Sequence, residues 1–236
     1  MQLKPIVAQL WAALYSEGKD NHFVYVQQVT TALTWMKTLF TSKSLLYATV
    51  YLQPAKLQTI IATDASPTGG GALLYVLPAE KMIDLDTLRR AAPWTWAARR
   101  WTSYDEMIAD SRRGDPGSQA RWEAYAAVSA LFLWQKVALD TRARITLVGD
   151  ALGVLFGTAV LRSKEKHINK LMMELALLLA PTGRCIDALH IWSEDNDLAD
   201  TLSRMNTNDD APNKLKTVNR TDWVETKWWR IVSTRV

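Results

Sequence analysis

The sequence contains a single cysteine, Cys185, in 236 residues. One thiol cannot form an internal disulfide, and it cannot supply the ligand set of a cysteine-based zinc site. We therefore expect an intracellular protein in a reducing compartment, with nucleus, cytoplasm and organelle left open.

Long apolar runs are also missing. No stretch reaches the roughly 18 residues that a membrane-spanning helix needs, and the most apolar segment, residues 171–181, is too short. The apolar stretch near the N-terminus, residues 6–15, is short, contains Gln9 and follows no basic region. We expect neither a membrane span nor a signal peptide.

The excess of one charge sign is small. Lys and Arg number 28 against 24 Asp and Glu, which gives a net charge of +4 and fits a polyanionic partner without requiring one. Hydrophobic residues make up 48% and charged residues 22%, so the composition is globular. The length fits one large domain, or one domain with extensions.

Alternating and helical patterns predict an α/β fold with a mixed sheet. Residues 1–50 are expected to be helical, with a loop at 18–21 and a second helix over 26–40. Strands are expected over 57–63, 72–77, 144–148 and 185–192, with a further strand beginning at 94–96 and a glycine-rich turn at 66–71. Helices are expected over 119–136, 167–179 and 198–205, and just after residue 150. Residues 206–236 read as a polar tail with a few aromatics.

Four acidic residues stand where a structural role would be costly. Asp64 and Asp150 each end an apolar strand, and strand ends of one sheet can converge on one crevice. Glu123 heads the apolar stripe of its helix, which continues through Ala126, Ala127, Ala130, Leu131 and Trp134. Asp200 lies early in the last helical segment. An unpaired carboxylate at a buried position is unfavourable, and a metal ion beside it removes that penalty.

Each acid also has an ordinary interpretation. Asp64 could form a turn, Glu123 could favour its helix dipole, and the other two could cap helices or lie on the surface. Four together are harder to explain in this way. Clustered carboxylates without thiols favour hard cations, Mg²⁺ or Mn²⁺, and two such ions about 3.5–4 Å apart can hydrolyse a phosphodiester.

A segment rich in arginine and tryptophan, residues 89–122, is a candidate nucleic-acid surface. The arginines we assign to nucleic-acid binding are Arg99, Arg100, Arg112, Arg113 and Arg121. The alternative is a solvated face over core tryptophans, and four neighbouring acids favour it: Asp105, Glu106, Asp110 and Asp115.

Four motifs in order resemble the ribonuclease H (RNase H) domain of a retroelement reverse transcriptase, gypsy-like or DIRS-like. They are Thr63-Asp64-Ala65-Ser66 with Gly69-Gly70-Gly71-Ala72, the helix 121–128, the segment 148–154, and the ending His190 to Arg204 with its A-D-x-L-S-R sequence. The resemblance covers about residues 55–205. Position 151 is Ala where the family often has a polar residue, and no polymerase motif is present.

This resemblance implies an RNase H-like mixed five-stranded sheet with flanking helices over 55–205, between a helical extension (1–50, a candidate connection segment) and the tail 206–236. It implies that Asp64, Glu123, Asp150 and Asp200 bind two Mg²⁺ or Mn²⁺ ions and are catalytic. The activity implied is hydrolysis of the RNA strand of RNA–DNA hybrids.

Two other functions stay open. A domesticated domain of this kind could be a structural or RNA-binding subunit of a ribonucleoprotein, with protein partners at 1–50 and 206–236. Another nuclease or an integrase on the same fold is disfavoured by the A-D-x-L-S-R ending. For His190, expected at the end of a strand, we favour a structural role over assistance in turnover.

Overall fold

The computed structural model describes residue 10, residues 26–41, 56–140, 144–180 and 184–224, and residue 229. The first expected helix and the loop at 18–21 therefore lie outside the described residues, apart from Leu10. The second expected helix is confirmed as α2 (Val26–Thr41).

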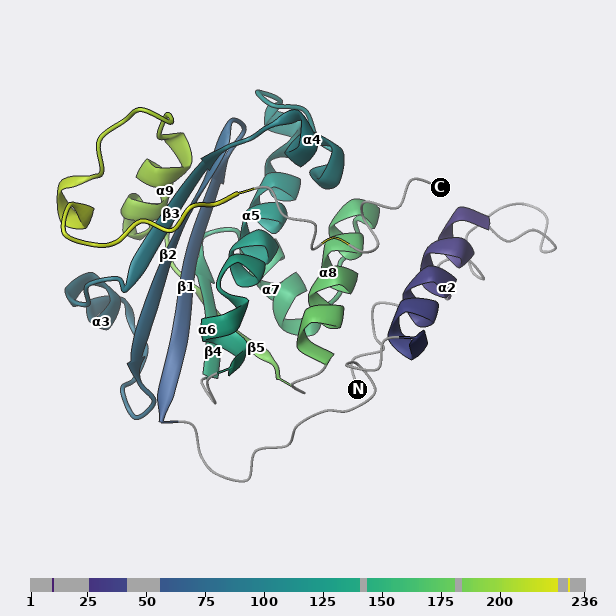
Figure 1. The fold of residues 1–236 in the computed structure, drawn as a ribbon, viewed down its shortest axis with the longest axis horizontal. Coiled ribbons are helices and arrows are strands. Elements are labelled where there is room, and N and C mark those ends of the chain that lie inside the picture. Colours follow the sequence, from purple (N-terminus) through teal and green to yellow (C-terminus); the bar gives the residue numbers. More distant parts are fainter. Residues whose placement is uncertain are drawn as a thin grey trace.

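A mixed five-stranded sheet forms the centre of the fold (Figure 1). Its strands are β1 (Leu57–Ser66), β2 (Gly69–Pro78), β3 (Thr95–Arg100), β4 (Arg144–Gly149) and β5 (Ile186–His190). The strand order is β3-β2-β1-β4-β5, with β1, β2 and β3 antiparallel and β4 and β5 parallel to β1. The predicted α/β class, with a mixed five-stranded sheet and flanking helices, is confirmed.

Helices cover both faces of the sheet. One face packs against α5 (Gln119–Leu133), α7 (Leu152–Val160) and α8 (Lys166–Leu179). The other face packs against α9 (Asp197–Arg204), with α3 (Leu85–Arg90) beside it. Two short helices, α4 (Ser103–Ala109) and α6 (Gln135–Asp140), flank α5 in sequence, and 3₁₀ turns occur at Pro116–Ser118, Ser193–Asp195 and Asn213–Leu215.

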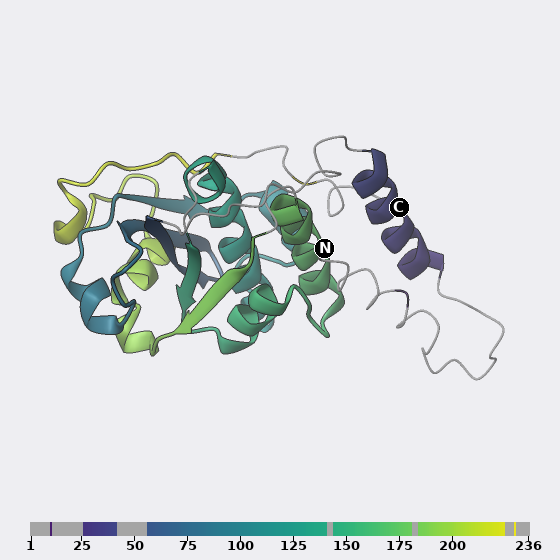
Figure 2. The same ribbon diagram turned by 90° about the horizontal axis from the view of Figure 1, so that it is seen from below.

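Helix α2 forms an outer layer, and Figure 2 shows α8 between it and the sheet. The indole nitrogen of Trp35 donates to the main-chain oxygen of Met173 on α8, at 3.0 Å. Both Trp35 and Ala32 are buried in this contact. None of the helices in the described ranges combines the length and apolarity needed to cross a bilayer.

Two hydrophobic cores lie on opposite faces of the sheet because side chains alternate along each strand. On β1, Ile61 belongs to the core under α5 and α8, whereas Ile60 belongs to the core under α9. Helix α5 is buried on nearly every side, from Trp122 to Phe132. Glu123 is therefore buried, as its place at the head of the apolar stripe predicted. The expected helix over 119–136 is interrupted at Trp134, where α5 ends and α6 begins.

The glycine-rich segment is a correction to the predicted turn at 66–71. The turn itself contains only Pro67 and Thr68, and Gly69, Gly70 and Gly71 belong to β2. These glycines allow close packing. A β-carbon on Gly71 would lie 2.3 Å from the main-chain oxygen of Ala199, and one on Gly70 would lie 2.3 Å from the Trp101 ring. Helix α9 can therefore approach β2 more closely than any side chain would allow.

Residues 206–224, which we call the C-terminal segment, contact the edge strand β3 through residues 218–221. The amide of Thr221 donates to the main-chain oxygen of Trp96 at 2.7 Å, and the Trp96 indole donates to the oxygen of Val218 at 3.0 Å. Leu215 and Trp223 are buried in the two cores. Trp223, expected in a polar tail, thus packs in the core. The segment that carries it covers the otherwise exposed edge of the sheet.

Close packing of β2 against α9 predicts a large effect of Gly71→Ala. The added methyl would overlap main-chain atoms of α9, so we expect the free energy of unfolding to fall by about 2 kcal/mol or more. Gly153→Ala is the matched control, because a β-carbon there meets nothing within 4 Å and lies in α7. It should raise stability by about 0.5–1 kcal/mol. Urea unfolding measures both, and equal effects would contradict the packing explanation.

Candidate metal centre

Three acidic side chains converge at the C-terminal ends of the central strands β1 and β4. Asp64, Glu123 and Asp150 each place one carboxylate oxygen within 4.8 Å of the others. The strand register explains the first pair: Ala62 lies opposite Val148 on parallel strands, and Asp64 and Asp150 each follow two residues later. Helix α5 crosses this region and contributes Glu123. The structure thus brings together three of the four predicted carboxylates.

Burial and mutual repulsion make these carboxylates hard to ionise. Burial raises the pKa of Asp64 to about 7; a hydrogen bond with Ser203 opposes this, and the charges of Asp150 and Asp200 add to it. The pKa of Glu123 is raised well above its ordinary value, first by burial and then by Asp64 and Asp150. A cation among the three would favour the charged form of each.

Polar neighbours hold the cluster in place. The side-chain amide of Gln119 donates to the main-chain oxygen of Ala65 at 2.5 Å and to Oε1 of Glu123 at 2.7 Å. The hydroxyl of Ser193 donates to Oδ2 of Asp150 at 2.6 Å. These contacts restrict the orientation of two of the carboxylates, as the outer shell of a metal site does. Neither supporting residue was predicted from the sequence. Gln119 lies one turn before Glu123 on α5, a spacing that could have indicated the contact, whereas Ser193 is 43 residues from Asp150.

The cluster fits a divalent metal ion. Oδ2 of Asp64 is buried and has no hydrogen-bond partner in the described part of the chain. A buried unpaired carboxylate oxygen is unfavourable unless something neutralises it. The three donors are all carboxylates, which suits a hard cation. Within the described ranges, this is the one group of three such residues close enough to share an ion.

Asp200, the fourth predicted ligand, lies outside this group. It stands in the first turn of α9 and pairs with Arg204, whose Nε and Nη2 lie 2.9 and 2.7 Å from its Oδ1. Its charge nevertheless raises the pKa of Asp64, so the two are electrostatic neighbours. Arg204 has the opposite effect on Asp64. We name the group of Asp64, Glu123 and Asp150 the carboxylate triad.

Asn196 connects the loop before α9 to β1, the strand that contains Asp64. Its side chain is buried, and its amide donates to the main-chain oxygen of Thr63 at 3.1 Å. His190 ends β5, as expected, and its exposed ring packs edge-on against Trp192 with centroids 5.3 Å apart.

Among the five arginines assigned to nucleic-acid binding, three pair with neighbouring acids. Arg99 pairs with the fully buried Asp105 at 2.9 Å. Arg113 pairs with Glu106, and Arg121 with Asp110 and Glu165. Three of the four acids that favoured the alternative interpretation therefore do pair with these arginines.

The remaining two differ. Arg112 is exposed, and Arg100 makes a long contact of 3.5 Å with the main-chain oxygen of Arg204. Arg100 thus connects β3 to the end of α9.

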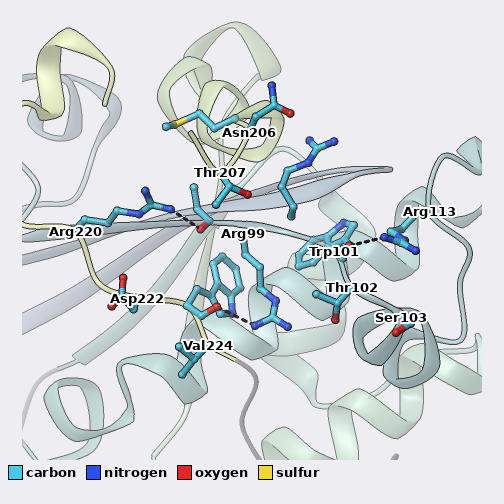
Figure 3. Close-up of a pocket in the computed structure, with 14 residues that line it drawn as sticks. Arg99, Trp101, Thr102, Ser103, Arg113, Asn206, Thr207, Arg220, Asp222 and Val224 are labelled. Carbon is cyan, nitrogen blue, oxygen red and sulfur yellow. Dashed lines mark hydrogen bonds between the residues drawn. The ribbon is translucent and has the colours of Figure 1, made fainter. Parts of the chain in front are cut away.

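A groove of about 640 Å³ lies between β3 and the C-terminal segment (Figure 3). Its lining includes four arginines: Arg99, Arg100, Arg113 and Arg220. Asp222 is the one acidic residue in the lining. Arg99 and Arg113 donate to the main-chain oxygens of Trp223 and Trp101, at 2.8 and 3.2 Å. The groove therefore has a positive excess and could hold an anion.

No family model matches this chain, and no curated protein matches it. Among solved structures, LC11-RNase H1 in complex with an RNA/DNA hybrid is 16% identical, with a TM-score of 0.43, over 61% of this chain and 93% of its own. RNase H1 from the halophilic archaeon Halobacterium salinarum NRC-1 is 16% identical over the same shares, with a TM-score of 0.36. A foamy viral protease-reverse transcriptase in complex with double-stranded DNA is 14% identical, with a TM-score of 0.34, over 81% of this chain and 31% of its own.

Strand order and direction give the sheet its RNase H-like character. Three antiparallel strands are followed by two that run parallel to β1, with helices on both faces. The chain accordingly has an RNase H-like fold, and its function has to be derived from the carboxylate triad.

The raised pKa of Asp64 predicts a pH-dependent stability in the absence of metal. The folded state holds its proton to about pH 7 and the unfolded state only to about 3.8. Because the folded state binds more protons between these values, stability should fall as pH rises through this range, by up to about 4 kcal/mol at roughly 1.4 kcal/mol per pKa unit. Asp64→Asn should flatten this dependence and stabilise the protein at pH 8 in EDTA. Thermal unfolding between pH 4 and 8 measures this, and parallel curves for the two proteins would contradict it.

The buried pair of Arg99 and Asp105 predicts that Arg99 stabilises the fold. Arg99→Leu would leave Asp105 buried without its cation, so we expect the free energy of unfolding to fall by about 3–5 kcal/mol. Arg112→Leu is the matched control, and as an exposed substitution it should change stability by less than about 0.5 kcal/mol. Chemical denaturation of both variants tests this, and a similar small effect would contradict a structural role for Arg99.

Proposed function

We propose that this chain is a metal-dependent endoribonuclease that hydrolyses the RNA strand of RNA–DNA hybrids, derived from the RNase H domain of a retroelement reverse transcriptase. The observation that carries the proposal is the carboxylate triad with its unpartnered Asp64 oxygen. A protein without use for a cation would gain stability by replacing any of the three acids with its amide.

Each residue has a role in this proposal. Asp64, Glu123 and Asp150 would hold the metal, with Asp200 as a fourth acid beside them. Gln119 and Ser193 orient Glu123 and Asp150 through the hydrogen bonds described above. Divalent ions bound there, two Mg²⁺ or Mn²⁺ in our proposal, would supply activated water and neutralise charge on the phosphate.

The groove beside β3 supports a nucleic-acid substrate. Arg100 and Arg220 line it, and neither pairs with a carboxylate in the described part of the chain. Arg100 also contacts the main-chain oxygen of Arg204, next to Asp200 and the triad. A strand whose scissile phosphate lies at the triad could therefore have other phosphates near these arginines.

One observation favours a second function. The bidentate pair between Arg204 and Asp200 occupies the fourth predicted ligand. A non-catalytic, RNA-binding subunit of a ribonucleoprotein would retain such a pair without penalty. This alternative predicts nucleic-acid binding without cleavage.

Cleavage of a labelled RNA–DNA hybrid tests the main proposal. We expect Mg²⁺-dependent cutting of the RNA strand, abolished by EDTA. Asp64→Asn should lower the rate by at least about 100-fold, since it removes a ligand of the metal that stabilises the transition state. Asp210→Asn, an exposed acid in the C-terminal segment, is the matched control and should leave the rate unchanged.

Two results would count against this function. A folded protein that binds the hybrid but cuts nothing in Mg²⁺ or Mn²⁺ would favour the ribonucleoprotein alternative. Equal rates for Asp64→Asn and Asp210→Asn would show that the observed cleavage does not come from the triad.

A further inference from the structure

Trp192 is the most exposed tryptophan in the described part of the chain. Its exposed fraction is 70%, and that of Trp94 is 57%, whereas the other described tryptophans are buried. Trp192 has no side-chain hydrogen bond within the described ranges, and its one ring neighbour there is His190. The indole therefore presents an apolar face and an N–H donor to solvent.

The backbone of Trp192 is fixed beside the carboxylate triad. The next residue, Ser193, donates to Asp150, and Asn196 donates to the main-chain oxygen of Thr63. The amides of Asp195 and Asn196 both donate to the main-chain oxygen of Trp192, at 2.9 and 3.2 Å. The turn that carries the indole is therefore attached at two points, to the carboxylate of Asp150 and to Thr63, which precedes Asp64 on β1.

These attachments limit the distance between the indole and the triad. Consecutive Cα atoms are about 3.8 Å apart, so a side chain one residue before Ser193 lies on the order of 10 Å from the Asp150 carboxylate. Nucleotides in a duplex strand rise by roughly 3 Å each. A strand whose phosphate lies at the triad thus brings its neighbouring nucleotides within reach of Trp192.

The surroundings favour a contact with sugars. In a paired hybrid the bases are stacked inside the duplex, and the wide, shallow minor groove presents ribose rings and 2′-hydroxyls. An indole can pack its face on a ribose and donate its N–H to a hydroxyl. Leu152, two residues after Asp150, is a second exposed apolar side chain, with an exposed fraction of 63%.

We propose that Trp192 is a substrate-contact residue whose indole packs against the sugar edge of the RNA strand, within a few nucleotides of the phosphate at the triad. This inference rests on the proposed hybrid substrate and adds a residue to its recognition. The exposed indole is then part of the binding surface, and no chemical step passes through it.

Steady-state cleavage of the hybrid gives the first test. Trp192→Ala should raise KM about tenfold, the order of an aromatic contact with a nucleotide, and change kcat by less than about twofold. Trp192→Phe keeps a ring and should recover most of the affinity. Trp94→Ala is the matched control: this exposed tryptophan precedes β3, at the opposite end of the strand from Arg100 and outside the groove lining, and the variant should match the unchanged protein. If Trp192→Ala and Trp94→Ala behave alike, the inference is overturned.

Fluorine NMR gives a direct test of contact that does not need cleavage. Protein labelled with fluorotryptophan, in the Asp64→Asn background, is titrated with the hybrid, and Trp192→Phe identifies the Trp192 signal by its loss. That signal should shift or broaden on binding, while the Trp94 signal stays in place. A bound hybrid that leaves the Trp192 signal unchanged would overturn the inference and direct attention to a protein partner for this surface.

Failure of the two proposals can be told apart. If the protein binds hybrid without cutting it, the proposed activity fails, while the fluorine signal still decides the role of Trp192. If cleavage is normal and Trp192→Ala has no effect on KM, the activity stands and the contact is wrong.

Discussion

Three carboxylate oxygens within 4.8 Å of one another repel strongly, and the elements around them are arranged to hold them together. The parallel register of β1 and β4 sets Asp64 and Asp150 side by side. The enclosed helix α5 keeps Glu123 away from water, which would otherwise screen its charge. No one of these elements relieves the repulsion, so relief must come from protonation or from a cation. The raised pKa values of Asp64 and Glu123 result from this burial and from the repulsion between the carboxylates.

Close contact between β2 and α9 extends this constraint to the opposite face of the sheet. Gly69 and Gly71 let α9 lie directly on the strand, and Ser66 donates to the main-chain oxygen of Ser203 at 2.9 Å. Because Asp200 and Arg204 are on α9, this contact also fixes how far their charges lie from Asp64. A helix packed one side chain further out would alter the electrostatics of the triad without changing any acid. Packing and chemistry are therefore coupled through residues that carry no charge.

The sequence could predict the features that depend on local pattern. Strand periodicity located β1 and β4, and the apolar stripe around Glu123 placed that acid on a buried face. Long-range pairs could not be predicted in this way. Arg99 and Arg121 look alike in sequence, yet the first is buried against Asp105 and the second lies half-exposed, because the path of α4 decides which acid each meets. The burial of Trp223 could not be predicted either, since it depends on the pairing of the C-terminal segment with β3.

The tryptophans also include buried ones that stabilise the fold and the exposed Trp192 beside the triad. Trp101 and Trp122 stack at 5.1 Å inside the core, where their burial stabilises the fold and helps to offset the repulsion of the triad. Trp192 is mostly exposed, and it stands on a turn in which Ser193 and Asn196 donate to Asp150 and Thr63. A turn anchored so firmly could carry a small polar residue with the same backbone geometry. An indole that is 70% exposed and packs only on His190 among the described rings adds little to stability, which is why we propose for it a contact with what the triad binds.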